Sequence, residues 1–507
     1  MTENIRLDAL RRLERTDPDD ADGLFRAGLA AIRSGLEREA LPFCRAGIKR
    51  HPADPRLWQI IGLAHRKLEE TAEAITAFTR AASLSPGDPL LAHSVARTTL
   101  EAGLPAISAF ERARRLAPDN GGVLLGEAAA LFAEGRLADA IAVLDEQLNR
   151  NPGWLEGHAT VTRLRWMRGD KEESTASFRA ALRKAPLTLE IWHALLNTLI
   201  DAELYGEALA TITRARGIAG QSPIFDTLEG ICLAEQGDVD GAERLFGRLG
   251  PHPHITLVVR HVRHLLRSGK PEEAARLAEG RVSGEGGEAL WPYLALAWRL
   301  TQDPRWQWLE GDPRFIGVYD IGAKVGSLDA LAECLRGLHL STYQPLEQSL
   351  RGGTQTDGPL FARIEPEIRR LRSAIVETVE QHVAALPPCD PAHPLLIRTR
   401  GPVRFAGSWS VRLTGEGFHV NHVHPAGWLS SAFYVALPEA SMGGASHAGW
   451  LTLGEATELG LDLPPVRMVE PKPGRLVLFP STMWHGTRSF AAGERLTVAF
   501  DVARPPQ

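Results

Sequence analysis

Three histidines near the C-terminus have a spacing that metal sites use. In FHVNHVHP, His422 and His424 are two residues apart, and side chains two apart on a β-strand point to the same face. His485 follows far downstream in FPSTMWHGT. Neutral imidazoles bind iron, zinc, copper and nickel. Because a His-x-His pair by itself is more often hydrogen-bonded or solvated, the hypothesis of a metal site also needs the residues that follow.

An arginine stands ten residues after His485, in the segment RLTVAFDV. The polar residues of this segment are Arg495, Thr497 and Asp501, and apolar residues alternate with them. The alternation predicts a strand whose polar face points inward and whose apolar face covers a helix predicted over residues 364–386. A guanidinium can bind both oxygens of a carboxylate, which a lysine cannot. The alternation therefore places Arg495 and Thr497 on the inward face.

Five further residues are candidates for a substrate pocket. They lie in the polar loop QSLRGGTQT, or upstream of and within the first histidine segment: Arg351, Gln355, Trp409, Arg412 and Asn421. The alternative for Trp409 is burial in the core. For Arg351 and Gln355 it is a plain solvated loop.

The elements that must position these residues change in type along the chain. Segments of period two dominate the C-terminal part, as in SWSVRL, FHVNHVH, SSAFYVAL, GWLTL, RLVLFP and RLTVAFDV. Short strands between turns rich in glycine and proline predict an antiparallel jelly roll over residues 334–507. Residues 281–333, rich in tryptophan, are predicted to form a helical cap or linker.

The N-terminal half repeats itself. Prolines recur with gaps of 34, 34, 32, 34 and 34 residues, at Pro18, Pro52, Pro86, Pro118, Pro152 and Pro186. The positions between paired helices keep step with them, at Gly35, Glu69, Gly103, Gly135, Gly169, Glu203, Gly237 and Gly269. Five residues after each stands a small residue: Ala40, Ala74, Ser108, Ala140, Ser174, Ala208, Ala242 and Ala274. This period is typical of tetratricopeptide repeats. It predicts an all-α solenoid of helical hairpins over residues 4–280.

Composition excludes several classes of protein. With 507 residues and a net charge of −5, the chain lacks the basic field of a nucleic-acid binder. The first residues are charged and no run of 18 apolar residues occurs, so a secretory signal and a membrane span are not expected and the predicted location is the cytoplasm. The four cysteines have no paired spacing, which argues against disulfides and zinc knuckles.

The order of the C-terminal residues resembles the 2-oxoglutarate/iron(II) oxygenase superfamily, which has a His-x-carboxylate pair, a distal histidine, then an arginine followed by a hydroxyl residue. It is most similar to the bacterial branch with HxHP and a P-x-P-G-x-L-V-x-F-P segment, matched by NHVHPAGWLSSAFYV and EPKPGRLVLFPSTMWHG. The resemblance implies a double-stranded β-helix, with iron(II) and 2-oxoglutarate as cofactors and ascorbate as reductant in vitro. It implies that His422 and His485 bind iron, and that Arg495 and Thr497 hold the distal carboxylate of 2-oxoglutarate.

This sequence departs from the superfamily at His424, where most members have Asp or Glu. Two interpretations stay open. His424 can complete a three-histidine face with His422 and His485. Alternatively, it lies outside the ligand set and water completes a two-histidine site.

A repeat array joined to such a domain is similar in architecture to the aspartyl/asparaginyl β-hydroxylases. The resemblance implies a dioxygenase that hydroxylates a peptide or protein side chain presented by the repeat array, with release of succinate and CO2. The alternatives are a small-molecule hydroxylase, or a non-catalytic repeat scaffold with a vestigial oxygenase fold. The expected partner is a peptide or protein bound in the repeat groove, with neither nucleic acid nor membrane.

Overall fold

The computed structural model describes residues 2–249, 254–341, 343, 346, 349–438, 447–490 and 492–505. The chain divides into two compact units. One contains residues 1–144, 357–373 and 505–507, and the other contains residues 145–356 and 374–504.

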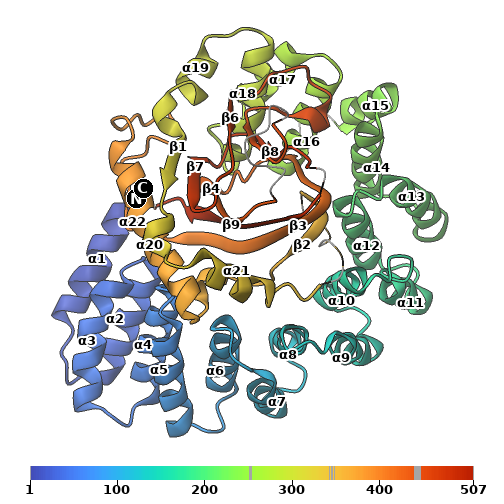
Figure 1. Ribbon diagram of the computed structural model, residues 1–507. Helices are drawn as coiled ribbons and strands as arrows, with labels where there is room; N and C mark the ends of the chain where they lie inside the picture. The colour runs from blue at the N-terminus through green and yellow to red at the C-terminus, as the bar shows by residue number, and fades with distance from the viewer. Residues whose placement is uncertain are drawn as a thin grey trace. The chain divides into compact units, whose positions relative to one another are not determined.

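Helical hairpins follow one another from the N-terminus to residue 279 (Figure 1). The helices of the first unit are α1 (Thr2–Arg15), α2 (Ala21–Arg33), α3 (Glu37–Arg50), α4 (Pro55–Lys67), α5 (Thr71–Leu84), α6 (Pro89–Glu101), α7 (Ile107–Leu116), α8 (Gly121–Ala133) and the start of α9 (Leu137–Arg150). The repeat helices of the second unit are α10 (Leu155–Arg168), α11 (Ala176–Lys184), α12 (Leu189–Asp201), α13 (Tyr205–Ala219), α14 (Pro223–Gln236), α15 (Val239–Leu249), α16 (Ile255–Arg267) and α17 (Pro271–Glu279). The predicted solenoid of tetratricopeptide type is confirmed.

The repeating residues act as their types predict. Asp54 and Asp88 accept hydrogen bonds from the first turns of α4 and α6, which begin with proline. All eight inter-helix positions have a positive φ, as at Gly35 with φ 72°. Most of the small residues that follow are fully buried. Ser108 is an exception: it is exposed, and Phe110 is buried on α7 instead, against Gly126.

Shorter helices and a sheet make up the rest of the chain. The helices are α18 (Trp291–Leu300), α19 (Arg305–Glu310), α20 (Gly322–Val325), α21 (Leu328–Arg336) and α22 (Pro366–Ala385). The strands are β1 (Gly317–Asp320), β2 (Leu350–Gln355), β3 (Phe405–His422), β4 (Gly427–Ala436), β5 (Leu451–Leu453), β6 (Arg467–Val469), β7 (Arg475–Pro480), β8 (His485–Thr487) and β9 (Glu494–Ala503). The helix expected over residues 364–386 is α22. The first strand, β1, lies inside the segment expected to be a helical cap.

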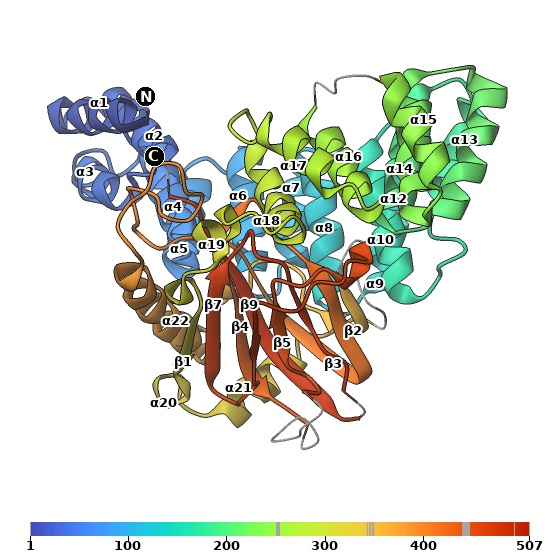
Figure 2. The same ribbon diagram turned by 90° about the horizontal axis from the view of Figure 1, so that it is seen from above.

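The sheet curls because one long strand pairs with strands in both of its halves. Its order is β1-β7-β4-β9-β3-β8-β5-β6, with β2 also paired to β3, and the pairs are antiparallel. The 18-residue β3 pairs with β9 along its first part and with β8 at its end. In Figure 1 the strands curve from β7 through β9 to β3 and return through β8, and Figure 2 shows the row of strands from above. This confirms the predicted jelly-roll type of fold.

The last strand occupies the middle of the sheet. β9 lies between β4 and β3, with Arg495 opposite Leu413 and Thr497 opposite Val411. Arg495 is only 3% exposed and Thr497 only 7%. The alternation along β9 therefore points its polar residues into the curled sheet, as the sequence predicts.

Among the residues that the structure describes, we find no helix that is both long enough and apolar enough to cross a lipid bilayer.

One buried histidine of α22 should make the fold sensitive to acid. His382 is 1% exposed and lies 2.9 Å (Nδ1) from the Tyr319 hydroxyl, and burial lowers its pKa to about 4. Below about pH 6.5 the unfolded chain binds a proton at this position and the folded chain does not, so stability is lost as the pH falls toward 4. At pH 5 this amounts to about 2 kcal/mol. The His382→Gln side chain can still form a hydrogen bond to Tyr319. We expect the free energy of unfolding of this variant to fall by about 2 kcal/mol less than that of the wild type between pH 7.5 and pH 5.

Urea unfolding of both proteins at the two pH values measures this difference. The comparison at pH 7.5 reports the packing cost of the substitution alone. An identical pH dependence in the two proteins would show that His382 is not responsible.

Candidate active site

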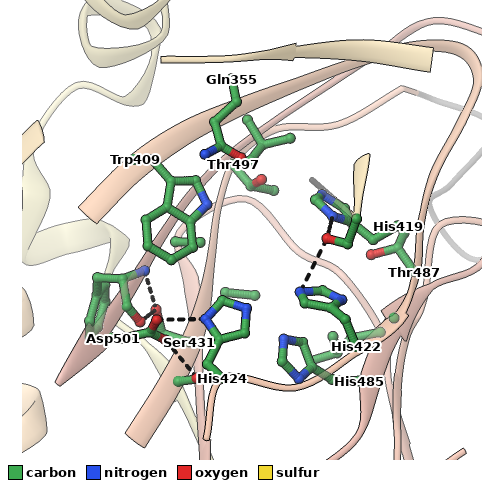
Figure 3. A pocket seen from close by; sticks show the side chains of 18 of the residues that line it. Gln355, Trp409, His419, His422, His424, Ser431, His485, Thr487, Thr497 and Asp501 are labelled. Carbon is green, nitrogen blue, oxygen red and sulfur yellow. Dashed lines mark hydrogen bonds and ion pairs between the residues drawn. The ribbon is translucent and has the colours of Figure 1, made fainter. Parts of the chain in front are cut away.

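The strand pairing brings the three candidate histidines together. His422 and His485 are direct cross-strand partners at the ends of β3 and β8, and His424 follows β3 by two residues. One ring nitrogen from each lies within 4.8 Å of the other two. The ring centroids are 4.2 Å apart for His422 and His485, 5.0 Å for His422 and His424, and 5.2 Å for His424 and His485. Figure 3 shows the three rings together at one end of a cavity.

Hydrogen bonds orient each imidazole in the same way. The Nδ1 of His422 donates to the carbonyl oxygen of Val420 (2.8 Å), and that of His485 donates to the carbonyl oxygen of Met483 (3.0 Å). The Nδ1 of His424 lies 2.5 Å from a carboxylate oxygen of Asp501. Because each Nδ1 faces an oxygen acceptor, each Nε2 is left with its lone pair, which is the form that binds a metal.

Burial keeps two of these imidazoles neutral. It is the main cause that lowers the pKa of His422 to about 3, and it lowers the pKa of His485 well below its usual value; the neighbouring imidazoles add to both effects. The two side chains are therefore uncharged at neutral pH without a metal to displace their protons. This electrostatic state suits ligation of a divalent cation.

Arg495 brings a buried positive charge to the same cavity. Its guanidinium carbon lies 5.2 Å from the ring centroid of Tyr434, and within the described parts of the chain it forms no ion pair. Its Nε and the Tyr434 hydroxyl are buried without a hydrogen-bond partner among the same residues. Burial lowers the pKa of Arg495, which shows how unfavourable the charge is there. A carboxylate ligand would supply the missing partner.

The cavity has an empty volume of about 630 Å³, including solvent at its mouth. Besides the three histidines and Arg495 it is lined by Thr497, Gln355 and Trp409. The indole of Trp409 stacks at 5.7 Å on the ring of His424, and Figure 3 shows Gln355 and Thr497 at the end opposite the histidines. The structure thus brings two of the five candidate pocket residues into the cavity.

The other three candidates lie elsewhere. Arg351 and Asn421 line an adjoining groove rather than the cavity. Arg412 lies on the opposite face of β3 from Val411, with its Nε 2.6 Å from a carboxylate oxygen of Glu494. Because Val411 faces the cavity and side chains alternate, Arg412 points away from it.

Sequence reasoning missed His419, which also lines the cavity. Its Nδ1 lies 3.2 Å from the Ser349 hydroxyl, and the same oxygen is 3.2 Å from Nε2 of His422. His419 and His422 are three positions apart, which in a regular strand would place them on opposite faces. The pairing of β3 with β8 shifts register between these two residues, and this brings both imidazoles to one side.

Asp501 is the second residue whose role the sequence did not reveal. One of its oxygens contacts His424, and the other accepts a hydrogen bond of 2.6 Å from the Ser430 hydroxyl. The polar face predicted for β9 already included Asp501, but not its partner. A carboxylate bound to a histidine ligand is a common outer contact in metal sites, where it orients the ring and increases its basicity.

The geometry agrees with comparisons to known families. The family model described as "Putative 2OG-Fe(II) oxygenase" matches residues 407–501, which hold all three histidines and Arg495. Models for tetratricopeptide repeats match residues 7–55, 43–89 and 106–164. The chain joins tetratricopeptide repeats to a 2-oxoglutarate/iron(II) oxygenase domain. The resemblance predicted from the sequence is thereby confirmed at the level of these two parts.

Individual relatives are similar over part of the chain. Protein NPGR2 of Arabidopsis thaliana is 25% identical over 287 residues, which are 48% of this chain and 39% of that protein. Residues 41 to the end of MamA from Desulfovibrio magneticus RS-1 are 18% identical with a TM-score of 0.29, over 33% of this chain and 95% of that one. YrrB, described as a TPR protein with an unusual peptide-binding site, is 16% identical with a TM-score of 0.28, over 35% of this chain and 92% of that one.

Proposed function

We propose that this protein is an iron(II)- and 2-oxoglutarate-dependent dioxygenase that hydroxylates a side chain of a peptide or protein, with release of succinate and CO2. The observation that carries the proposal is the convergence of two complementary sites in one cavity. Three imidazoles offer their Nε2 lone pairs at one end, and a buried guanidinium without a carboxylate partner among the described residues faces the same space.

The residues present fit both cofactors. His422, His424 and His485 would hold the iron, and Arg495 with Thr497 would hold the distal carboxylate of 2-oxoglutarate. When bound, iron(II) and 2-oxoglutarate supply the activation of dioxygen and the transfer of one oxygen atom to a carbon of the substrate.

The chain's own residues position these groups. Asp501 keeps Nδ1 of His424 protonated and orients its ring, while Trp409 stacks on the face of that ring. The carboxylate of Asp501 places a negative charge one hydrogen bond away from the ligand set. It thus partly replaces the charge that a ligating aspartate would provide.

Succinate formation tests this proposal. The purified protein with iron(II), ascorbate and 2-oxoglutarate should form succinate slowly by itself, and faster with the correct substrate. Two substrate pools prepared from one cell extract are compared, one of peptides and one of small metabolites. Stimulation by peptides, with gain of one oxygen atom in a peptide, supports the proposal. Stimulation only by the metabolite pool would favour a small-molecule hydroxylase, and no succinate above the metal-free protein would indicate a scaffold.

The assignment of His424 as the third ligand predicts a specific pattern of substitutions. We expect His424→Ala to weaken iron binding by more than the roughly 10- to 100-fold typical of an outer-shell change, and His424→Asp to restore much of it, because aspartate offers an oxygen ligand at the usual place. Asp501→Asn should reduce iron affinity by roughly 10- to 100-fold at most, since it removes only the orienting carboxylate. Anaerobic titration with iron(II) measures all three affinities.

The Asp501→Asn variant is also the internal control for a general disturbance of the cavity. Iron affinity that is nearly unchanged in His424→Ala would instead leave a two-histidine site completed by water. Failure of His424→Asp to recover any affinity would argue the same way.

A further inference from the structure

A polar groove adjoins the histidine cavity within the second unit. Repeat helices form one wall, with Trp166 near the end of α10, Tyr205 at the start of α13 and Arg260 within α16. The oxygenase domain forms the other wall, with Val420. Ser349 and His422 line both the groove and the cavity. The groove therefore lies directly beside the place where the chemistry is proposed to occur.

We propose that this groove binds the substrate, and that its occupant is an extended segment of another polypeptide, with one side chain entering the histidine cavity. That the bound segment is the substrate rests on the function proposed above. The binding surface itself is argued from the groove alone.

The size and charge of the groove favour a peptide. Its empty volume is about 1480 Å³ including solvent, more than twice that of the cavity. Its ionisable lining residues include three acidic and three basic side chains: Asp201, Glu203, Glu458, Arg260, Arg263 and Arg351. A balanced lining does not favour a polyanion such as nucleic acid. A peptide main chain, which carries donors and acceptors alike, suits it.

The walls are held in place by contacts that do not need a ligand. Arg351 of β2 lies 2.7 Å from the Glu203 carboxylate, and Arg263 lies 2.7 Å from that of Glu235. Next to the groove, helices α16, α17 and α18 pack against the oxygenase domain through an apolar cluster. This cluster includes Leu294, Trp298, Leu459 and Trp484. A preformed groove loses less conformational entropy when it binds.

The turn residue Glu203 contributes to the repeat wall of the groove. It has φ 60°, a conformation that favours glycine, and glycine occupies six of the eight equivalent turns. Its carboxylate, which is 59% exposed, pairs with Arg351 of β2, so a repeat turn and a strand meet among the residues that line the groove. The glutamate therefore belongs to the architecture of the groove.

The equivalent turns of the first unit bind the protein's own chain. Glu69, with φ 57°, pairs with Arg372 at 2.9 Å, and its carbonyl oxygen accepts a hydrogen bond of 2.9 Å from Arg369. The amide of Ile364 donates to the carbonyl oxygen of Ala102 (3.2 Å). The turns of Glu69 and Glu203 are thus alike, since each pairs its carboxylate with an arginine from a later part of the chain.

Binding of random peptides tests the inference. A library of dodecapeptides displayed on phage is selected on the full chain, and the affinities of the enriched peptides are measured for variants. Arg260→Ala removes one lining arginine while Arg263 and Arg267 still bind Glu235, and Ala202→Trp fills the groove from the end of α12. We expect each to weaken the enriched peptides by about tenfold or more.

Arg97→Ala is the matched control. It also removes one arginine from a shared carboxylate, because Glu101 keeps its ion pair with Arg66 just as Glu235 keeps its other partners in Arg260→Ala. It should bind the peptides as the wild type does. Equal binding by the wild type and both groove variants would overturn the inference, and so would a selection that enriches no peptide over the empty support.

Succinate formation by the wild type without any peptide separates this inference from the proposed function. If peptides bind in the groove but the protein never converts 2-oxoglutarate, the peptide site is supported and the proposed enzyme activity is refuted. If the protein converts 2-oxoglutarate but its groove binds no peptide, the enzyme activity is supported and the peptide site is refuted.

Discussion

His485→Ala is expected to abolish the conversion of 2-oxoglutarate to succinate. His485 is one of only three imidazoles in the proposed ligand set, it lies directly opposite His422, and it is 8% exposed. Alanine removes a ligand and leaves a gap that water can fill, but water does not restore the fixed geometry of a protein ligand. Iron affinity should fall by more than the roughly 10- to 100-fold loss of an outer contact, and turnover should reach the background of the metal-free protein.

Succinate measurement at saturating 2-oxoglutarate, together with anaerobic iron titration, checks this result. His382→Gln is the matched control, because it replaces a buried histidine of α22 outside the cavity and should keep full activity. Turnover by His485→Ala comparable to the wild type would remove His485 from the ligand set. A wild type that binds iron but forms no succinate would refute the enzyme.

Arg495→Ala should raise the 2-oxoglutarate requirement far more than it weakens iron binding. A charge-assisted pair between a guanidinium and a carboxylate, shielded from water, is worth roughly 2 to 4 kcal/mol, or about 30- to 1000-fold in affinity. Arg495 is almost fully buried and forms no ion pair among the described residues, so its charge is available to the ligand. The concentration of 2-oxoglutarate that gives half-maximal succinate formation measures the effect.

Arg412→Ala is the control for this substitution. Arg412 belongs to the strand that pairs with Arg495, but its side chain points to the other face and binds Glu494. It should leave the 2-oxoglutarate requirement unchanged. Equal losses of iron and 2-oxoglutarate affinity in Arg495→Ala would show that the arginine supports the fold rather than the ligand.

The sequence determined the features that repeat over short distances. A period of 34 residues with a turn position in each hairpin predicts the solenoid, because each helix pair follows the same local rules. Alternation along β9 placed Arg495 and Thr497 on one inward face for the same reason. The pattern around SWSVRL also sets Trp409 and Arg412 on opposite faces, so only one of them could line the cavity.

Only the tertiary structure decided the contacts between segments far apart in the chain. The approach of Asp501 to His424 depends on the path of the chain from β3 to β9, and the place of His419 depends on a register shift against β8. The short strand β1 has no alternating pattern of its own and is defined by its pairing with β7.

The groove is the clearest case of such dependence. Its lining includes residues of α10, α12, α13, α16, β2 and β3, and no local pattern relates Tyr205 or Arg260 to His422. Periodicity reflects the geometry of a single helix or strand, so it predicts which face of that element is buried. Which faces meet is decided by the packing of the whole chain, where apolar burial and paired charges select one arrangement among many.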